Sequence, residues 1–177
     1  MRVIGIGSPF GDDAAGLEAA RILARNPPPG CEVLAADRPG AGLLELLDTS
    51  KPVILIDAVR SGAAPGTLHE LSFDDLDRCG SRFVSSHELG VGASIQLARK
   101  LGCAPAPGWV LGIEIPPETV RIPCPLSRTV RRAVKQAVLR LPHWVDELGP
   151  QWKPACTSDK DTDKEASDGG NREDERR

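Results

Sequence analysis

The chain has 177 residues, of which 40% are hydrophobic and 27% charged, and its formal net charge is −3. This length and composition are ordinary for one globular domain with a single core. Because the chain lacks a basic excess and only 3% of its residues are aromatic, we do not expect a nucleic-acid partner.

The cysteines and the lengths of the apolar segments bear on the cellular compartment that we expect for this protein. The cysteines are odd in number, scattered, and without a C-x-x-C pair, which favours reduced thiols: Cys31, Cys79, Cys103, Cys124 and Cys156. We see no signal peptide, and no apolar stretch approaches the roughly 18 residues of a membrane span. We therefore expect a cytoplasmic protein that does not associate with a membrane.

Strand and helix patterns alternate along the chain. The unbroken apolar run 52–56 is typical of a strand buried on both faces of a parallel sheet, so we expect it at the centre, and the weaker pattern over 67–71 predicts an edge. The alternation predicts an α/β fold with one twisted, mostly parallel β-sheet sandwiched between helices. In chain order we predict strands over 1–6, 32–36, 52–56, 67–71 and 109–115, and helices from residue 12 or 13 to the prolines of 26–30, and over 43–47, 88–101 and 126–139.

Composition divides the chain into two parts. The alternating pattern runs through residues 1–150, for which we predict one domain. Beyond it, almost no apolar residue remains, and residues 153–177 hold six Lys/Arg and eight Asp/Glu. Such a segment buries too little apolar surface to offset the entropy of ordering, so residues 151–177 are predicted to form a disordered charged tail.

Two carboxylates follow predicted strands at the edge where parallel strands end. Asp13 comes just after the loop that follows the first strand, with Asp12 beside it, and Asp57 directly follows the run 52–56. Ligands of open α/β sheets bind at this carboxyl edge. An Asp before a helix can also cap it, and loop amides could satisfy Asp57, so each residue alone has a plain structural explanation.

A histidine joins the two carboxylates. Ser85 and Glu88 fit a capping box, which would place His87 in the first turn of the helix, where the dipole favours the neutral ring that a metal needs. An isolated histidine there would more often be a surface residue. Two carboxylates and one imidazole would suit a divalent transition ion with open coordination positions, so the convergence predicts a metal site of Asp13, Asp57 and His87. His69 and His143 lack such a context and are interpreted as structural or surface residues.

Several stretches, in the same order, resemble the hydrogenase maturation proteases. They are Gly5–Gly16, Ile54–Val59 and Ser86–Gly90, with weaker likenesses at Pro65–Thr67, Gly112–Pro116 and Pro125–Ser127. The resemblance covers about residues 1–141. It implies a twisted sheet between helices, and an endopeptidase that removes a C-terminal extension from the large-subunit precursor of a nickel-containing hydrogenase after nickel insertion.

The resemblance also implies a site and a partner. The family's metal-contacting positions fall on Asp13, Asp57 and His87, with Asp12 as a possible substitute for Asp13. Nickel would be supplied by the substrate, the hydrogenase large-subunit precursor. Neither a catalytic nucleophile nor a cofactor-binding residue can be assigned. A protein of this family that binds the precursor as a chaperone, without cutting it, is the alternative.

Two other classes fit less well. A dinucleotide-binding fingerprint would begin at Gly5 and Gly7 but would need glycine where Phe10 stands. A serine hydrolase could use Ser86 and His87, but adjacent residues rarely form the nucleophile–base geometry and G-x-S-x-G is missing.

Overall fold

Strand β3 lies at the centre of the sheet, as its apolar run predicts. In the computed structural model, which describes residues 1–47, 50–79, 84–85, 90–103, 105–117 and 124–148, every residue of Val53–Val59 is buried. The elements are β1 (Arg2–Gly7), the 3₁₀ turn η1 (Gly11–Ala14), α1 (Ala15–Leu23), β2 (Glu32–Asp37), the 3₁₀ turn η2 (Gly40–Gly42), α2 (Leu43–Leu46), β3 (Val53–Arg60), β4 (Leu68–Ser72), α3 (Phe73–Cys79), β5 (Val84–Ser85), α4 (Val91–Lys100), β6 (Gly108–Glu114) and α5 (Arg128–Leu148).

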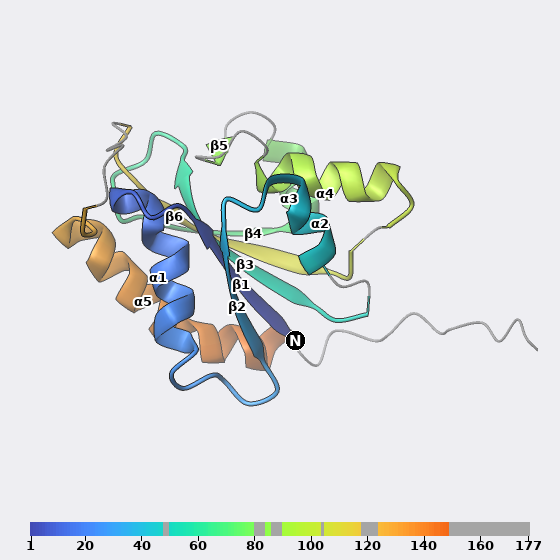
Figure 1. The fold of residues 1–177 in the computed structure, drawn as a ribbon, viewed down its shortest axis with the longest axis horizontal. Coiled ribbons are helices and arrows are strands. Elements are labelled where there is room, and N and C mark those ends of the chain that lie inside the picture. Colours follow the sequence, from blue (N-terminus) through green and yellow to red (C-terminus); the bar gives the residue numbers. More distant parts are fainter. Residues whose placement is uncertain (48–49, 80–83, 86–89, 104, 118–123, 149–177) are drawn as a thin grey trace, which may run out of the picture.

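The sheet is mostly parallel and has the order β2-β1-β3-β6-β4 (Figure 1). Strands β2, β1, β3 and β6 pair in parallel, β4 pairs antiparallel with β6 at the edge, and the short β5 pairs antiparallel with the end of β3. Both the predicted fold class and the edge position of the strand near residues 67–71 are confirmed. The parallel order also brings the carboxyl ends of β1, β2 and β3 to one edge of the sheet.

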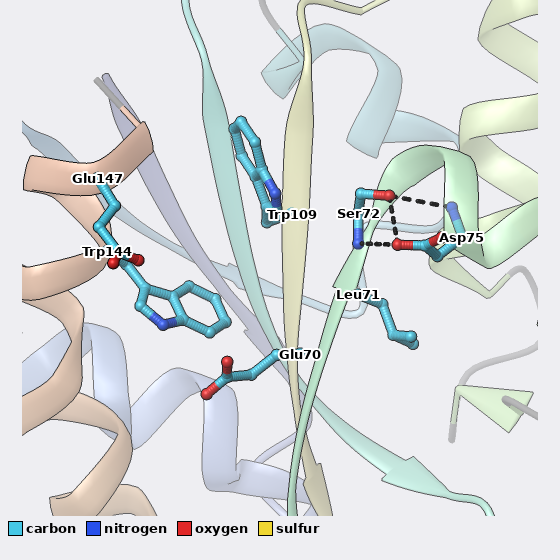
Figure 2. A pocket seen from close by; sticks show the side chains of 7 residues that line it. All are labelled: Glu70, Leu71, Ser72, Asp75, Trp109, Trp144 and Glu147. Carbon is cyan, nitrogen blue, oxygen red and sulfur yellow. Dashed lines mark hydrogen bonds between the residues drawn. The ribbon is translucent and has the colours of Figure 1, made fainter. Parts of the chain in front are cut away.

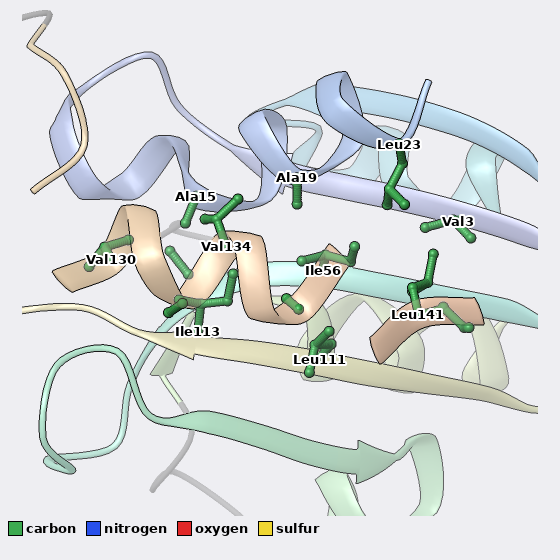
Figure 3. Close-up of a cluster of buried hydrophobic side chains, with 14 of the residues drawn as sticks. Val3, Ala15, Ala19, Leu23, Ile56, Leu111, Ile113, Val130, Val134 and Leu141 are labelled. Carbon is green, nitrogen blue, oxygen red and sulfur yellow. The ribbon is translucent and has the colours of Figure 1, made fainter. Parts of the chain in front are cut away.

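Helices cover both faces of the sheet. Alternate residues of β3 separate two apolar clusters: Ile54 and Ile56 pack beneath α1 and α5 (Figure 3), whereas Val53 and Leu55 pack beneath α2, α3 and α4. This is the period-2 pattern expected of a strand between two helical layers. No helix of the described residues is long and apolar enough to cross a membrane.

Three helices and one strand differ from the predictions. Helix α5 continues to Leu148 although Pro142 lies within it, because Leu141 and Trp144 are buried in the core beneath it. Packing therefore outweighs the hydrogen bond that proline removes from a helix. Helix α3 and strand β5 were not predicted, and α4 begins at Val91 rather than near residue 88. The predicted tail, residues 151–177, lies outside the described residues.

Helix α1 approaches the sheet closely where Gly16 faces Gly5. A Cβ added to Gly16 would lie 2.1 Å from the carbonyl oxygen of Ile6 and 2.3 Å from that of Ile56. One added to Gly5 would lie 2.0 Å from the carbonyl oxygen of Gly16. Glycines on both sides of this contact let α1 approach the backbones of β1 and β3.

We predict that Gly16→Ala lowers the free energy of unfolding by about 2 kcal/mol or more, because the new methyl group meets two backbone carbonyls that cannot move aside. The measurement is urea denaturation followed by circular dichroism. Gly92→Ala is the matched control, since Gly92 is also helical but has open space around its added Cβ, and alanine there should be neutral or stabilising. Equal losses in the two variants would contradict this account.

Candidate functional site

Asp13 is a buried carboxylate with one oxygen left without a partner. It lies in η1, which contacts both β1 and β3, and only 6% of its surface is exposed. The Ser8 hydroxyl donates to Oδ2, and the Ser8 amide donates to the Asp13 carbonyl at 3.2 Å. Oδ1 has no hydrogen-bond partner among the described residues. Asp13 makes no capping hydrogen bond, so the helix-cap explanation does not account for it.

Asp12 faces a different part of the molecule. Its Oδ1 accepts a hydrogen bond at 2.6 Å from the amide of Ser127, just before α5. Nearby, Phe10 and Cys124 form an isolated parallel bridge. Asp12 therefore joins the loop after β1 to the chain that enters α5, and the two neighbouring carboxylates have different surroundings.

Asp57 lies inside β3 rather than at its end. The strand continues to Arg60 because β6 pairs with it as far as Val59 and β5 pairs with its last two residues, which corrects the prediction that Asp57 ends the strand. On the other side, pairing with β1 stops at Ile56, one residue before Asp57. The side chain is 1% exposed, and its Oδ1 accepts a hydrogen bond from the Ala58 amide at 2.8 Å.

The third predicted ligand, His87, lies outside the described residues, as does Ser86. The predicted capping box is wrong: Gly90 is the N-cap of α4, and Ser85 is part of β5, where it pairs with Val59. The helix-dipole argument for a neutral His87 therefore fails, because α4 starts too late. Within the described part of the chain, no group of three or more His, Cys, Asp or Glu side chains could hold a metal ion.

A third buried carboxylate, that of Glu114, was given no role by the sequence analysis. It is 2% exposed and accepts hydrogen bonds from the Ser61 amide at 2.9 Å, the Gly62 amide at 3.0 Å and the Ser61 hydroxyl at 2.8 Å. His69 Nε2 lies 2.9 Å from its Oε2. One acidic residue inside an apolar strand run is a signal that could have been used, since a buried charge needs partners.

These residues do not form a hydrolytic triad. The Ser61 hydroxyl lies 3.4 Å from His69 Nε2, the same ring nitrogen that faces Glu114, whereas a triad uses the two ring nitrogens for the two partners. The cluster instead closes the loop between β3 and β4 onto β6, so His69 is structural. His143 is largely exposed and pairs with Glu147 on α5 at 3.3 Å.

Arg38 has an unusual backbone at the carboxyl end of β2. Its φ of +43° makes it the one non-glycine residue with positive φ in the described part of the chain, a conformation that costs an L-residue about 1–2 kcal/mol. Its amide donates to the Gly7 carbonyl at 2.9 Å, and its guanidinium carbon lies 5.6 Å from the centre of the Phe10 ring. Hydrogen bonds to Asp37 and attraction to it, with a smaller attraction to Asp13, raise the pKa of Arg38.

A pocket of about 240 Å³ lies near the amino end of β6, and its lining includes Trp109, Trp144 and Glu70 (Figure 2). Trp109 pairs with Ile54, three residues before Asp57, so this pocket lies toward the other end of the strands from the carboxylates.

The comparisons assign the chain to a family. Residues 19–143, more than half of the chain, match a family model described as hydrogenase maturation protease. The chain belongs to the hydrogenase maturation protease family. Among the curated proteins, no sequence matches.

Solved structures of hydrogenase maturation proteases share the fold. The maturating endopeptidase HybD from E. coli has 25% sequence identity and a TM-score of 0.70, and the match covers 84% of this chain and 93% of that one. The [NiFe] hydrogenase maturation protease HybD from Thermococcus kodakarensis has 24% identity and a TM-score of 0.65, covering 83% and 97%. HycI from Thermococcus kodakarensis KOD1 has 18% identity and a TM-score of 0.60, covering 82% and 91%.

For this maturation protease-family chain we predict that Glu114→Ala lowers the free energy of unfolding by roughly 3 kcal/mol or more, because it leaves two backbone amides and a hydroxyl without their acceptor. Glu70→Ala on β4 is the control. Glu70 is exposed and only pairs with Arg140 at 3.3 Å, so its loss should cost less than about 1 kcal/mol. Urea denaturation of both variants is the measurement, and a small loss for Glu114→Ala would show that the cluster is dispensable.

Proposed function

We propose that this chain is an endopeptidase that removes the C-terminal extension of a nickel-containing hydrogenase large-subunit precursor after nickel insertion. The observation that carries the proposal is the Asp13 carboxylate, which is buried against β3 while its Oδ1 has no partner in the part of the chain that the structure describes. A buried, half-satisfied carboxylate is costly unless a cation or donor completes it. Family membership supplies the reaction class and the substrate class.

The residues fit a metal ion that arrives with the substrate. Asp13 Oδ1 has no hydrogen-bond partner among the described residues, and Asp57 is buried within β3, the strand that η1 contacts. We propose His87 as the third ligand, because it follows Ser85 by two residues and Ser85 pairs with the end of β3. Two carboxylates and an imidazole leave coordination positions of a divalent transition ion for the substrate's own ligands.

Asp13, rather than Asp12, is the proposed ligand. Asp12 already accepts the Ser127 amide at 2.6 Å, which is a structural role. Ser8 holds Oδ2 of Asp13, so Oδ1 is the atom available to a cation. The sequence analysis gave Ser8 no role. Its position as a small polar residue directly after the buried Gly5-Ile6-Gly7 stretch is a signal that could have been used.

Nickel in the precursor would act as the signal for cleavage. A precursor without nickel would not be held by Asp13, Asp57 and His87, and it should not be cut. A bound metal ion can also polarise a carbonyl group or activate water. We place the reaction in the cytoplasm, a reducing compartment that suits the free thiols of Cys31, Cys103 and Cys124.

The proposed reaction is tested by the intact mass of a hydrogenase large-subunit precursor after incubation with this protein. We expect the nickel-loaded precursor to lose a C-terminal peptide and the nickel-free precursor to keep its mass. Binding without a mass change would favour the chaperone alternative. If the nickel-free precursor is cut equally well, the metal is not the signal.

The two neighbouring aspartates give a matched pair of variants. We predict that Asp13→Asn lowers the cleavage rate at least tenfold, as loss of a metal-contacting group does, while the free energy of unfolding stays the same or rises because a buried charge is removed. Asp12→Asn keeps an amide oxygen for the Ser127 amide and should cleave at nearly the wild-type rate. The measurements are cleavage kinetics by mass spectrometry and urea denaturation. Reversed effects would identify Asp12 as the ligand.

A further inference from the structure

Arg38 lies over the loop that holds Asp13. Its amide donates to the Gly7 carbonyl, Gly7 precedes Ser8, and the Ser8 hydroxyl donates to Asp13. Its guanidinium lies over the ring of Phe10, and the Asp13 amide donates to the Phe10 carbonyl at 3.3 Å. The Arg38 side chain is 55% exposed, so its charge is presented to solvent at the carboxyl edge of the sheet.

One edge of the Arg38 guanidinium donates hydrogen bonds to Asp37, and the other edge makes no hydrogen bond with the described residues. Nε donates to Asp37 Oδ1 at 2.7 Å and Nη2 donates to Asp37 Oδ2 at 3.2 Å, so Asp37 takes the side edge. The end edge, formed by Nη1 and the second hydrogen of Nη2, has no partner among the described residues. A guanidinium can bind a carboxylate through two parallel N–H donors on either edge. The pair with Asp37 therefore fixes the orientation of the open edge.

The strained backbone is not explained by local stability. Glycine adopts a positive φ without strain, whereas arginine does not, and Pro39 further disfavours a helical backbone at the residue before it. An exposed ion pair and an exposed cation–π contact contribute little. Strain kept at the edge of a candidate site is typical of a residue with a functional role.

We propose that Arg38 is a specificity-determining residue whose end edge binds a carboxylate of the substrate segment next to the bond that is cut. The inference rests on the proposed function and narrows its substrate class to precursors with a carboxylate near the cleavage site. This carboxylate belongs to an Asp or Glu side chain, and binding of the C-terminal carboxylate of the extension is the alternative that the experiment separates. Asp37 holds the guanidinium in place and is a positioning residue.

The experiment compares wild-type protein with Arg38→Gly, Arg38→Lys and Arg38→Glu on a nickel-loaded precursor, with Arg21→Gln as a charge-matched control on the exposed surface of α1. Acidic residues of the precursor near the cut are changed singly to the amide and to lysine, and a separate precursor carries two extra C-terminal glycines to displace the terminal carboxylate. Binding is measured by calorimetry and cleavage by mass spectrometry. Melting temperatures report stability.

We expect Arg38→Gly to raise KM on the order of tenfold with kcat little changed and the melting temperature equal or higher, because glycine relieves the backbone. Arg38→Lys should recover only part of the affinity, since it lacks the two-nitrogen edge. Arg38→Glu should be rescued by one acid-to-lysine precursor if a side chain is bound. Weakened cleavage of the glycine-extended precursor would identify the terminal carboxylate instead.

The outcomes separate the two proposals. If wild-type protein cleaves and Arg38→Gly leaves KM unchanged for every precursor, the role of Arg38 is overturned and the protease function stands. A lowered melting temperature with no dependence on precursor charge would show that Arg38 is structural. If wild-type protein neither binds nor cleaves nickel-loaded precursor, the proposed function fails and the inference fails with it.

Discussion

The rest of the structure depends on the close contact between α1 and the backbones of β1 and β3. Side chains normally separate a helix from a sheet, but Gly5 and Gly16 have none, and backbone carbonyls line the contact here. The contact brings η1 against β3, which buries Asp13 beside the strand that carries Asp57. A larger residue at Gly16 would move the helix and the turn away together. The geometry of the candidate site is thus a consequence of backbone packing.

Three acidic residues differ in how far their carboxylates are satisfied: Glu114 and Asp13 are buried, and Asp12 is partly exposed. Glu114 receives donors from a loop and a histidine, and Asp12 receives the Ser127 amide. These two join segments distant in the sequence. One oxygen of the buried Asp13 carboxylate has no partner among the residues that the structure describes. An unsatisfied charge lowers stability, so its retention needs an explanation in binding.

Arg38 shows the same opposition between stability and function at the surface of the site. Its backbone is strained, and its contacts with Asp37 and Phe10 return little stability in exposed surroundings. Asp13 and Arg38 lie on neighbouring loops that follow adjacent parallel strands, β1 and β2. The buried Asp13 carboxylate and the strained Arg38 backbone both lower stability, and both lie at the same edge of the sheet. Open α/β sheets bind their ligands at this edge.

The sequence by itself determined the sheet class, its central strand and its edge strand, because burial on two faces or one imposes distinct apolar patterns on a strand. It also pointed to Asp13 and Asp57, which stay predicted metal ligands, although Asp57 lies within β3 and not at its end. Only the tertiary structure decided between Asp12 and Asp13 as the open carboxylate, because the difference lies in a contact with Ser127, more than a hundred residues away. The start of α4 was likewise decided by tertiary pairing, which places Ser85 in a strand beside β3. The partners of Glu114 come from two other segments of the chain, and local sequence patterns carry no information about such contacts.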